Sequence, residues 1–544
     1  MADSSSAATA VATLLERFSS TSYVKLIASA VALVFTILMV IDKFVSAPVD
    51  PREPPVVKGL LPIIGHWITV NTSYPGVYEK LAPVEGVTTK NTVLTPNPTT
   101  HSKRTKLPIC TIPVLGKKMY VINSAPLVQS AMRNKTLEFG ARIEEIGRAM
   151  GINPEVTHRL VKENAVEEIS RVTISALSGE NLLKLNLSAL DYIGSRFNEV
   201  KPGSPEKIDD VFHWARGLIA VATTRALYGE HSPFNNLELV DAIWTYESGM
   251  GKMQYGWISK IIAGKALEAR KKIVTGLVGY YMRKMDQGPT VSATIRGRAE
   301  FWRGFGLSDV MLGAMDSLPA ASTVNTAPSM FWLIVNVFAN PKYLARVREE
   351  VEASAALAII AGGGKRVATI DVTELGKSCA YVVACYRETL RSENTVTGSR
   401  TVTSKDTTIT DHETGRQYLL KEGVEVQWSA SVMHKKPVWG EDGEAFNPER
   451  WLKNTPEIAK GSKESFVPFG GGKHLCPGRN FAFAELLGAV ACLAVGFELE
   501  GVQVPDHEMP FSTSGLRSPI YGSKSSKATL SRRAGWEDVE WRFK

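Results

Sequence analysis

The chain has 544 residues, of which 44% are hydrophobic and 22% are charged, and its formal net charge at pH 7 is +8. This charge is mild for the length and no block of like charges occurs, so nucleic acid is not an expected partner. The five cysteines are an odd number scattered through a long chain, which fits a reducing compartment rather than a disulfide framework.

An uncharged apolar stretch near the N-terminus, Leu26–Ile41, is the first predicted element. With its flanks it is long enough to cross a bilayer as a helix. A cleaved secretory signal is an alternative, but the polar lead of residues 1–20 and the lack of a small-x-small cleavage site argue against it. The sequence predicts an N-terminal tail and membrane anchor over residues 1–47, with the transmembrane helix at about 24–45.

A proline-rich segment follows the apolar stretch. It contains Pro48, Pro51, Pro54 and Pro55. Such a run cannot continue a helix and makes a stiff spacer, which also argues against a core helix at the apolar stretch. We therefore expect a linker over residues 48–58.

The remainder predicts a mainly α fold with a minor β-sheet. Residues 107–122 have the pattern of two β-rich segments around a turn, and β character returns over residues 396–428. Between them, from Ala125 to about Glu352, helical patterns dominate.

The segment Ser308–Ala339 predicts one long helix with an N-capping serine and an Asn-Pro stop. Within it, Pro328 has no N–H to return to the carbonyl of Val324, so the helix should open locally. The alternative is that Pro328 only kinks a core helix and that Asn325 satisfies the freed backbone.

A further helix is expected over Glu374–Glu393. Near its end, Glu388 and Arg391 are three residues apart, so they share one face and can pair. Glu-x-x-Arg is common in helices and an exposed pair contributes little, so this pattern by itself says nothing about function.

The glycine-rich loop Phe469–Ala482 holds Cys476 and leads into an apolar helical stretch. A thiolate at a helix N-terminus faces unpaired N–H groups and the positive end of the helix dipole, which suits a haem ligand. Gly472 and Gly478 would allow unusual backbone conformations and close approach of a flat ring, with Phe469 as an aromatic wall. A buried, inert cysteine is the alternative.

The spacing Phe-x-x-Gly-x-x-x-Cys-x-Gly closely resembles the haem-binding signature of the cytochrome P-450 family, the haem-thiolate monooxygenases. Glu-x-x-Arg and the segment Phe446–Trp451 resemble two more family motifs, in the family order. The resemblance implies the cytochrome P-450 fold for residues 59–544, as one haem-thiolate catalytic domain. It implies haem b as cofactor and Cys476 as the axial ligand of the haem iron.

Other site residues are implied residue by residue. Glu388, Arg391 and Arg450 would form a buried charged triad that locks the cysteine loop onto the core. Arg400 and His474 stand where relatives contact the haem propionates. The expected substrate pocket is lined by small or hydroxylated residues near three segments of the family layout: Ala321, Val324, Thr395, Val396, Thr397, Ser512, Thr513 and Ser514.

The oxygen side departs from the family pattern. Most members carry an acidic residue followed by threonine, a pair that relays protons, where this chain has Val324 and Asn325. The pattern looks like the animal subgroup that contains the sterol 7-hydroxylases and prostacyclin synthase. We therefore expect Asn325 and Thr326 to be the catalytic residues that carry protons, together with water.

The N-terminal organisation resembles that of microsomal members. It implies a single-pass protein of the endoplasmic reticulum membrane, in contact with lipid, whose catalytic domain is cytosolic. Electrons from NADPH would arrive through NADPH-cytochrome P-450 reductase, with cytochrome b5 as a second donor to consider.

The predicted function is a haem-dependent monooxygenase that oxidises a lipophilic small molecule, such as a sterol, terpenoid or alkaloid of secondary metabolism. One alternative is a haem-thiolate isomerase or dehydratase that acts on an oxygenated lipid without a reductase. A non-enzymatic haem sensor is the third reading.

Overall fold

A computed structural model describes most of the chain. The residues described are 29, 33, 36, 50–57, 66, 76–81, 107–114, 117–139, 143–144, 147, 152–253, 258–362, 365–403, 405–435, 437–453, 456–505, 515–517 and 526–544. Apart from three isolated positions, the predicted anchor lies outside the described residues, as do Ser512, Thr513 and Ser514.

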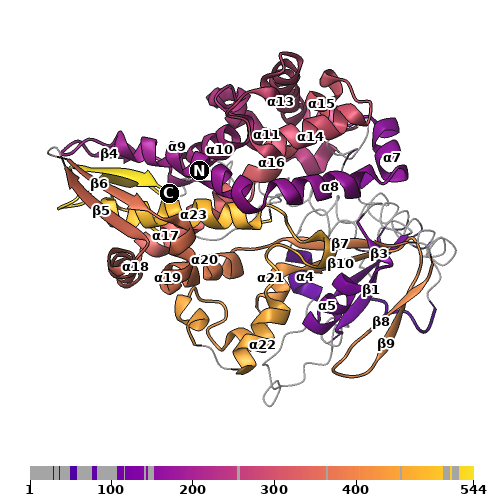
Figure 1. Ribbon diagram of the computed structural model, residues 1–544. Coiled ribbons are helices and arrows are strands. Elements are labelled where there is room, and N and C mark those ends of the chain that lie inside the picture. Colours follow the sequence, from indigo (N-terminus) through magenta and orange to yellow (C-terminus); the bar gives the residue numbers. More distant parts are fainter. Residues whose placement is uncertain are drawn as a thin grey trace, which may run out of the picture.

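The fold is mainly helical (Figure 1). In chain order its helices are α4 (Gly76–Leu81), α5 (Ala125–Arg133), α7 (Pro154–Lys162), α8 (Ala165–Ala176), α9 (Gly179–Asn198), α10 (Val211–Tyr228), α11 (Leu237–Met253), α12 (Ser259–Ile262), α13 (Gly264–Met282), α14 (Ala293–Gly304), α15 (Asp309–Met315), α16 (Leu318–Thr323), α17 (Thr326–Phe338), α18 (Pro341–Ala353), α19 (Val372–Ser378), α20 (Ala380–Ser392), α21 (Ala430–Met433), α22 (Pro456–Ser465) and α23 (Arg479–Gly496).

The β-structure is small, as predicted, and within the described residues it falls into four sheets. The largest has the order β1-β2-β10-β7-β3, and its strands are β1 (Ile109–Val114), β2 (Lys117–Ile122), β3 (Leu137–Glu138), β7 (Thr397–Val402) and β10 (Glu425–Ser429). One three-stranded sheet contains β4 (Glu206–Ile208), β11 (Phe497–Glu500) and β12 (Ala528–Arg532). A second contains β5 (Leu357–Gly362), β6 (Lys365–Ile370) and β13 (Val539–Phe543). The two-stranded sheet contains β8 (Thr407–Thr410) and β9 (Gln417–Leu420).

In the part of the chain that the structure describes, two hydrophobic cores hold these elements together. The larger lies among the helices, where α17 packs against α10, α20 and α23 and every residue of α17 is buried. The smaller lies beneath the five-stranded sheet, with apolar residues of α5 and α21. In the described part of the chain, α23 is the one helix long and apolar enough to cross a membrane, yet 78% of it is buried, as in a core helix.

The prediction of one continuous helix over Ser308–Ala339 is wrong, because α15, α16 and α17 occupy this segment. At the first break, the carboxylate of Asp316 accepts hydrogen bonds from Leu318 N (3.1 Å) and from the hydroxyls of Tyr228 (2.6 Å) and Tyr281 (2.7 Å). These bonds, two of them to α10 and α13, hold Asp316 in an extended conformation (ψ 104°).

The second break falls at Val324 and Asn325, which precede Pro328 by four and three residues. The helix was predicted to open locally at this point. Pro328 lacks the N–H that would bond back to Val324, so the helical ladder is interrupted there. This break places Asn325 at the N-terminus of α17.

The predicted helix over Glu374–Glu393 is also divided, into α19 and α20, at Cys379. The Glu350 carboxylate of α18 accepts hydrogen bonds from Tyr381 N (2.8 Å) and Val382 N (2.9 Å). It thereby caps the first turn of α20, a long-range contact that local periodicity does not reveal.

Candidate functional site

Cys476 lies in the loop that enters α23, which agrees with the predicted position. Its backbone N–H donates to Phe469 O (3.1 Å), which closes the loop, and Arg479 Nη1 donates to Cys476 O (3.0 Å). The side chain is partly buried. The loop therefore fixes the backbone on both sides of the thiol.

Burial raises the pKa of the Cys476 thiol, although the backbone N–H groups of Gly478 and Arg479 and the charge of Arg479 act in the opposite direction. The N–H groups at the helix N-terminus thus lower the pKa of the thiol, as expected, but desolvation raises it by more. A bound metal cation would supply the missing stabilisation, because a coordinating thiol is deprotonated outright.

The two glycines of the signature differ in backbone conformation. Gly472 has φ +63°, and a Cβ there would collide with the backbone oxygen of Met132 in α5, so only glycine fits. Gly478 has φ −80°, an ordinary value, so the expected unusual backbone conformation is absent at this position.

Arg400 on β7 is a buried cation with no acidic partner among the described residues. It is 5% exposed, it donates to Ser399 O (2.7 Å), and its guanidinium lies 5.4 Å from the Trp428 ring. Burial lowers its pKa to about 10. An uncompensated buried charge is costly, so this site fits a bound anionic group.

His474 provides an unbonded polar atom close to Arg400. Its Nε2 is buried and has no hydrogen-bond partner, and both His474 and Arg400 flank the ring of Phe139, at 5.9 Å each. Burial, with Arg400 and Lys473 nearby, lowers the pKa of His474 to about 4. The cysteine loop, Arg400 and His474 together fit haem, whose carboxylates these two side chains would bind.

Glu388, Arg391 and Arg450 meet in the interior, where their exposed fractions are 0%, 2% and 8%. Arg391 donates to both oxygens of Glu388 (2.9 and 2.8 Å), and Arg450 Nε donates to Glu388 Oε1 (2.9 Å). Asn447 N and Trp451 Nε1 add bonds of 2.9 Å to the same carboxylate. Glu388 is thus a fully bonded anion shared by both cations, and Asp442 supplies Arg450 with a second carboxylate (3.1 Å).

The route from this triad to the cysteine loop runs through His434, which sequence reasoning missed. His434 Nδ1 lies 3.1 Å from Arg391 O, and its Nε2 accepts from Val467 N (3.1 Å), two residues before Phe469. Burial lowers the pKa of His434 to about 3, so it is neutral and can donate at one nitrogen and accept at the other. A lone histidine outside any motif gives no sequence signal for this role.

The oxygen-side residues are engaged in hydrogen bonds. Asn325 Oδ1 accepts from Gly515 N (2.7 Å), and the Thr326 hydroxyl donates to Ser322 O (2.9 Å). The Asn325 amide thus bonds to a distant segment rather than to its own helix, unlike the alternative in which it satisfies the freed helix backbone.

The described residues predicted to line the pocket belong to two neighbouring segments. Val324 and Thr395 are buried, whereas Ala321 is exposed. The Thr397 hydroxyl is buried without a hydrogen-bond partner. Val396 lies directly beside Gly515, so the turn after α20 and the segment bonded to Asn325 are in contact.

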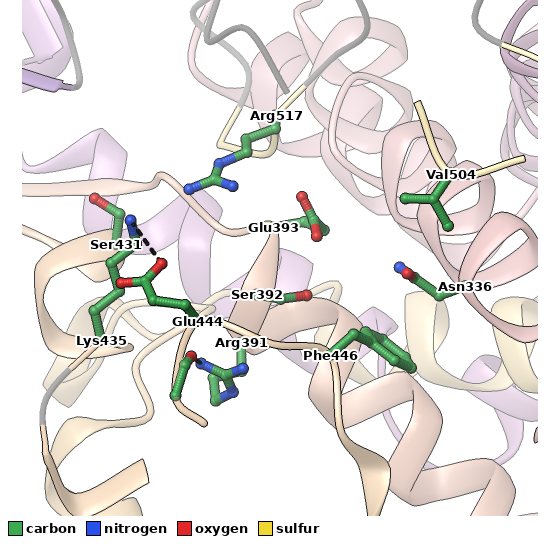
Figure 2. Close-up of a pocket in the computed structure, with 11 residues that line it drawn as sticks. Asn336, Arg391, Ser392, Glu393, Ser431, Lys435, Glu444, Phe446, Val504 and Arg517 are labelled. Atoms are coloured by element: carbon green, nitrogen blue, oxygen red, sulfur yellow. Dashed lines mark hydrogen bonds and ion pairs between the residues drawn. The ribbon is translucent and has the colours of Figure 1, made fainter. Parts of the chain in front are cut away.

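A polar cavity of about 280 Å³ opens beside the triad, and none of the predicted pocket residues lines it. Arg517, Glu393 and Asn336 lie around it, and Lys435 pairs with Glu444 at its edge (Figure 2). Its lining carries charges of both signs, which suits water better than a lipophilic substrate.

Comparisons with known proteins bear on the family and the fold. The family model described as Cytochrome P450 matches residues 308–524. A cytochrome P450 monooxygenase of Gibberella zeae is 31% identical over 520 residues, which cover 93% of this chain and 94% of the relative. Cytochrome P450 monooxygenase nodJ of Hypoxylon pulicicidum is 28% identical over 537 residues, with 96% and 97% coverage.

Among solved structures, retinoic acid bound cyanobacterial CYP120A1 is similar with a TM-score of 0.63. The alignment covers 88% of this chain and 99% of that chain at 17% sequence identity, so it bears on the fold alone.

Proposed function

Because this chain belongs to the cytochrome P450 family and is a monooxygenase, we propose that it oxidises a lipophilic small molecule at a haem held by Cys476. Sterols, terpenoids and alkaloids are the substrate classes that small and hydroxylated pocket residues would suit. The observation that carries the assignment of the haem site is the cysteine loop with two neighbouring groups that lack a counterpart: the buried cation of Arg400, which has no acidic partner among the described residues, and the unbonded Nε2 of His474.

Haem, when bound, would supply a redox-active iron that activates dioxygen for insertion of one oxygen atom into a C–H or C=C bond. Cys476 would bind that iron, Arg400 would neutralise a propionate, and the uncharged His474 would orient one through a hydrogen bond from its ring N–H. Glu388, acting through Arg391 and the neutral His434, would keep the loop in place without touching the cofactor.

We propose that Asn325 and Thr326 carry protons at the oxygen side. With valine at the preceding position, no carboxylate is available there. Since Asn325 Oδ1 is occupied by Gly515, its Nδ2 is the group left to donate, and the Thr326 oxygen can still accept. Water at the helix opening would connect them.

Turnover is expected to require NADPH, dioxygen and NADPH-cytochrome P-450 reductase. The assay incubates the purified enzyme with lipid extracts of its source, with and without the reductase, and follows new oxygenated products by mass spectrometry. A product gaining one oxygen atom only with reductase supports the monooxygenase. Equal turnover without NADPH and reductase would instead establish the isomerase or dehydratase.

The same assay tests the relay. Asn325→Ala should divert electrons from product to hydrogen peroxide, because the amide donor is lost, and the ratio of product to NADPH consumed should fall by about tenfold. Unchanged coupling would remove Asn325 from the proton path.

We further propose that residues 1–47 are an uncleaved anchor that leaves the catalytic domain in the cytosol at the endoplasmic reticulum. Deleting residues 1–47 should shift most of the enzyme from the membrane to the soluble fraction without loss of haem, as followed by fractionation and absorbance. Glycosylation of Asn71 in the intact protein would place the domain in the lumen and contradict this topology.

A further inference from the structure

The short segment Gly515–Arg517 is hydrogen-bonded along both of its edges. On the side of α17, Asn325 Oδ1 accepts from Gly515 N (2.7 Å) and Trp332 Nε1 donates to Arg517 O (2.7 Å). Asn325 and Trp332 are seven residues apart, or about two helical turns, so they present both contacts on one face.

The other edge bonds to the turn that follows α20. Thr395 N donates to Gly515 O (2.8 Å), and Arg517 N donates to Glu393 O (2.9 Å). The segment therefore has both backbone polar groups of Gly515 and of Arg517 satisfied, half of them by α17 and half by the turn.

This turn also reaches the cysteine loop. Asn394 forms a β-bridge with Leu516, and its Nδ2 donates to Pro468 O (3.2 Å), beside Phe469. Three parts of the proposed active site are thus joined through Gly515–Arg517: the oxygen-side helix, the turn that carries Val396, and the loop that carries Cys476.

The space around Gly515 leaves no room for a side chain. A Cβ at this position would collide with Val396 Cγ2 and would lie 3.0 Å from Asn325 Oδ1. Glycine is therefore required so that the backbone can lie between the amide of Asn325 and the side chain of Val396. Asn325 and Val396 together set how closely this backbone approaches the pocket.

We infer that Asn325 is a positioning residue that determines substrate specificity, because its amide oxygen holds Gly515 against Val396 and so fixes one wall of the substrate pocket. The inference rests on the proposed function for the identity of the pocket. The positioning role is separate from proton transfer, because positioning uses Oδ1 of Asn325 and proton transfer would use its Nδ2. Asn325→Asp keeps an acceptor for the Gly515 N–H, and Asn325→Ala does not.

Hydrogen exchange of the peptide that contains Gly515–Arg517 tests the contact directly in the full-length enzyme. Asn325→Ala should exchange this peptide about tenfold faster than wild type, because a hydrogen bond is lost. Asn325→Asp should keep the protection, and Ser322→Ala, a polar-to-alanine control in α16 whose hydroxyl bonds Leu318 O, should leave it unchanged. Wild-type exchange in Asn325→Ala would overturn the inference, as would equal loss of protection in the aspartate variant.

The effect on the pocket is measured with 4-phenylimidazole, compared with imidazole, by absorbance titration. Gly515→Ala should weaken 4-phenylimidazole binding by about tenfold and leave imidazole binding unchanged, and adding Val396→Ala should restore it by relieving the collision. Equal affinities in all three proteins would refute the positioning role. A wild-type protein that takes up no haem would contradict the proposed function instead. The hydrogen-exchange measurement would still test the contact between Asn325 and Gly515, because it does not require haem.

Discussion

Replacing Cys476 with alanine should abolish the red-shifted Soret band that thiolate-ligated, reduced haem shows with carbon monoxide. The expected loss is complete, because among the five cysteines only Cys476 lies in the loop beside the unpaired cation of Arg400 and the unbonded Nε2 of His474. Difference absorbance of the purified, reduced protein measures it.

Cys110→Ala is the matched control, because Cys110 is fully buried on β1 and its change leaves the loop intact. This control should retain the band at normal wavelength. A normal band in Cys476→Ala would show that another residue ligates the iron, and the assignment of the site would be wrong.

Replacing Glu388 with alanine should prevent stable haem incorporation rather than merely slow turnover. The Glu388 carboxylate accepts five hydrogen bonds, from Arg391 (two), Arg450, Asn447 and Trp451. Its removal leaves the buried guanidinium of Arg391 without an anionic partner among the described residues and leaves Arg450 with Asp442 alone (3.1 Å), at a cost of about 3–5 kcal/mol, comparable to the whole stability of many domains. Haem per protein and the midpoint of thermal unfolding measure the effect.

Glu449→Ala is the control for this experiment. Glu449 lies next to Arg450 and pairs with Arg346, but both side chains are partly exposed, at 39% and 45%. Such a pair contributes about 0–1 kcal/mol, so haem content should stay near wild type. If Glu388→Ala folds and binds haem at wild-type yield, the triad has no structural importance.

Sequence spacing was sufficient for the features that depend on local order. The pairing of Glu388 with Arg391 follows from helical geometry, and the position of Cys476 before α23 follows from the glycine-rich loop and the apolar run after it. The opening of the helix ahead of Pro328 followed from the missing N–H of proline.

The tertiary structure alone decided the features that depend on distant partners. Helix boundaries near Asp316 and Cys379 are set by hydroxyls of Tyr228 and Tyr281 and by the Glu350 carboxylate, which come from other helices. The hydrophobic periodicity of one segment contains no information about hydrogen bonds from other helices. Each of the two segments was therefore predicted as one continuous helix.

The same limit applies at the site. His434 connects the triad to the cysteine loop across 33 residues of sequence, and Asn325 reaches Gly515 across 190. The sequence by itself determined the family and which residues are predicted to carry its chemistry, because both predictions depend on residue type and spacing. Only the tertiary structure decided which of their polar atoms are occupied and which are left for a cofactor or a proton, because hydrogen bonds between distant segments consume them.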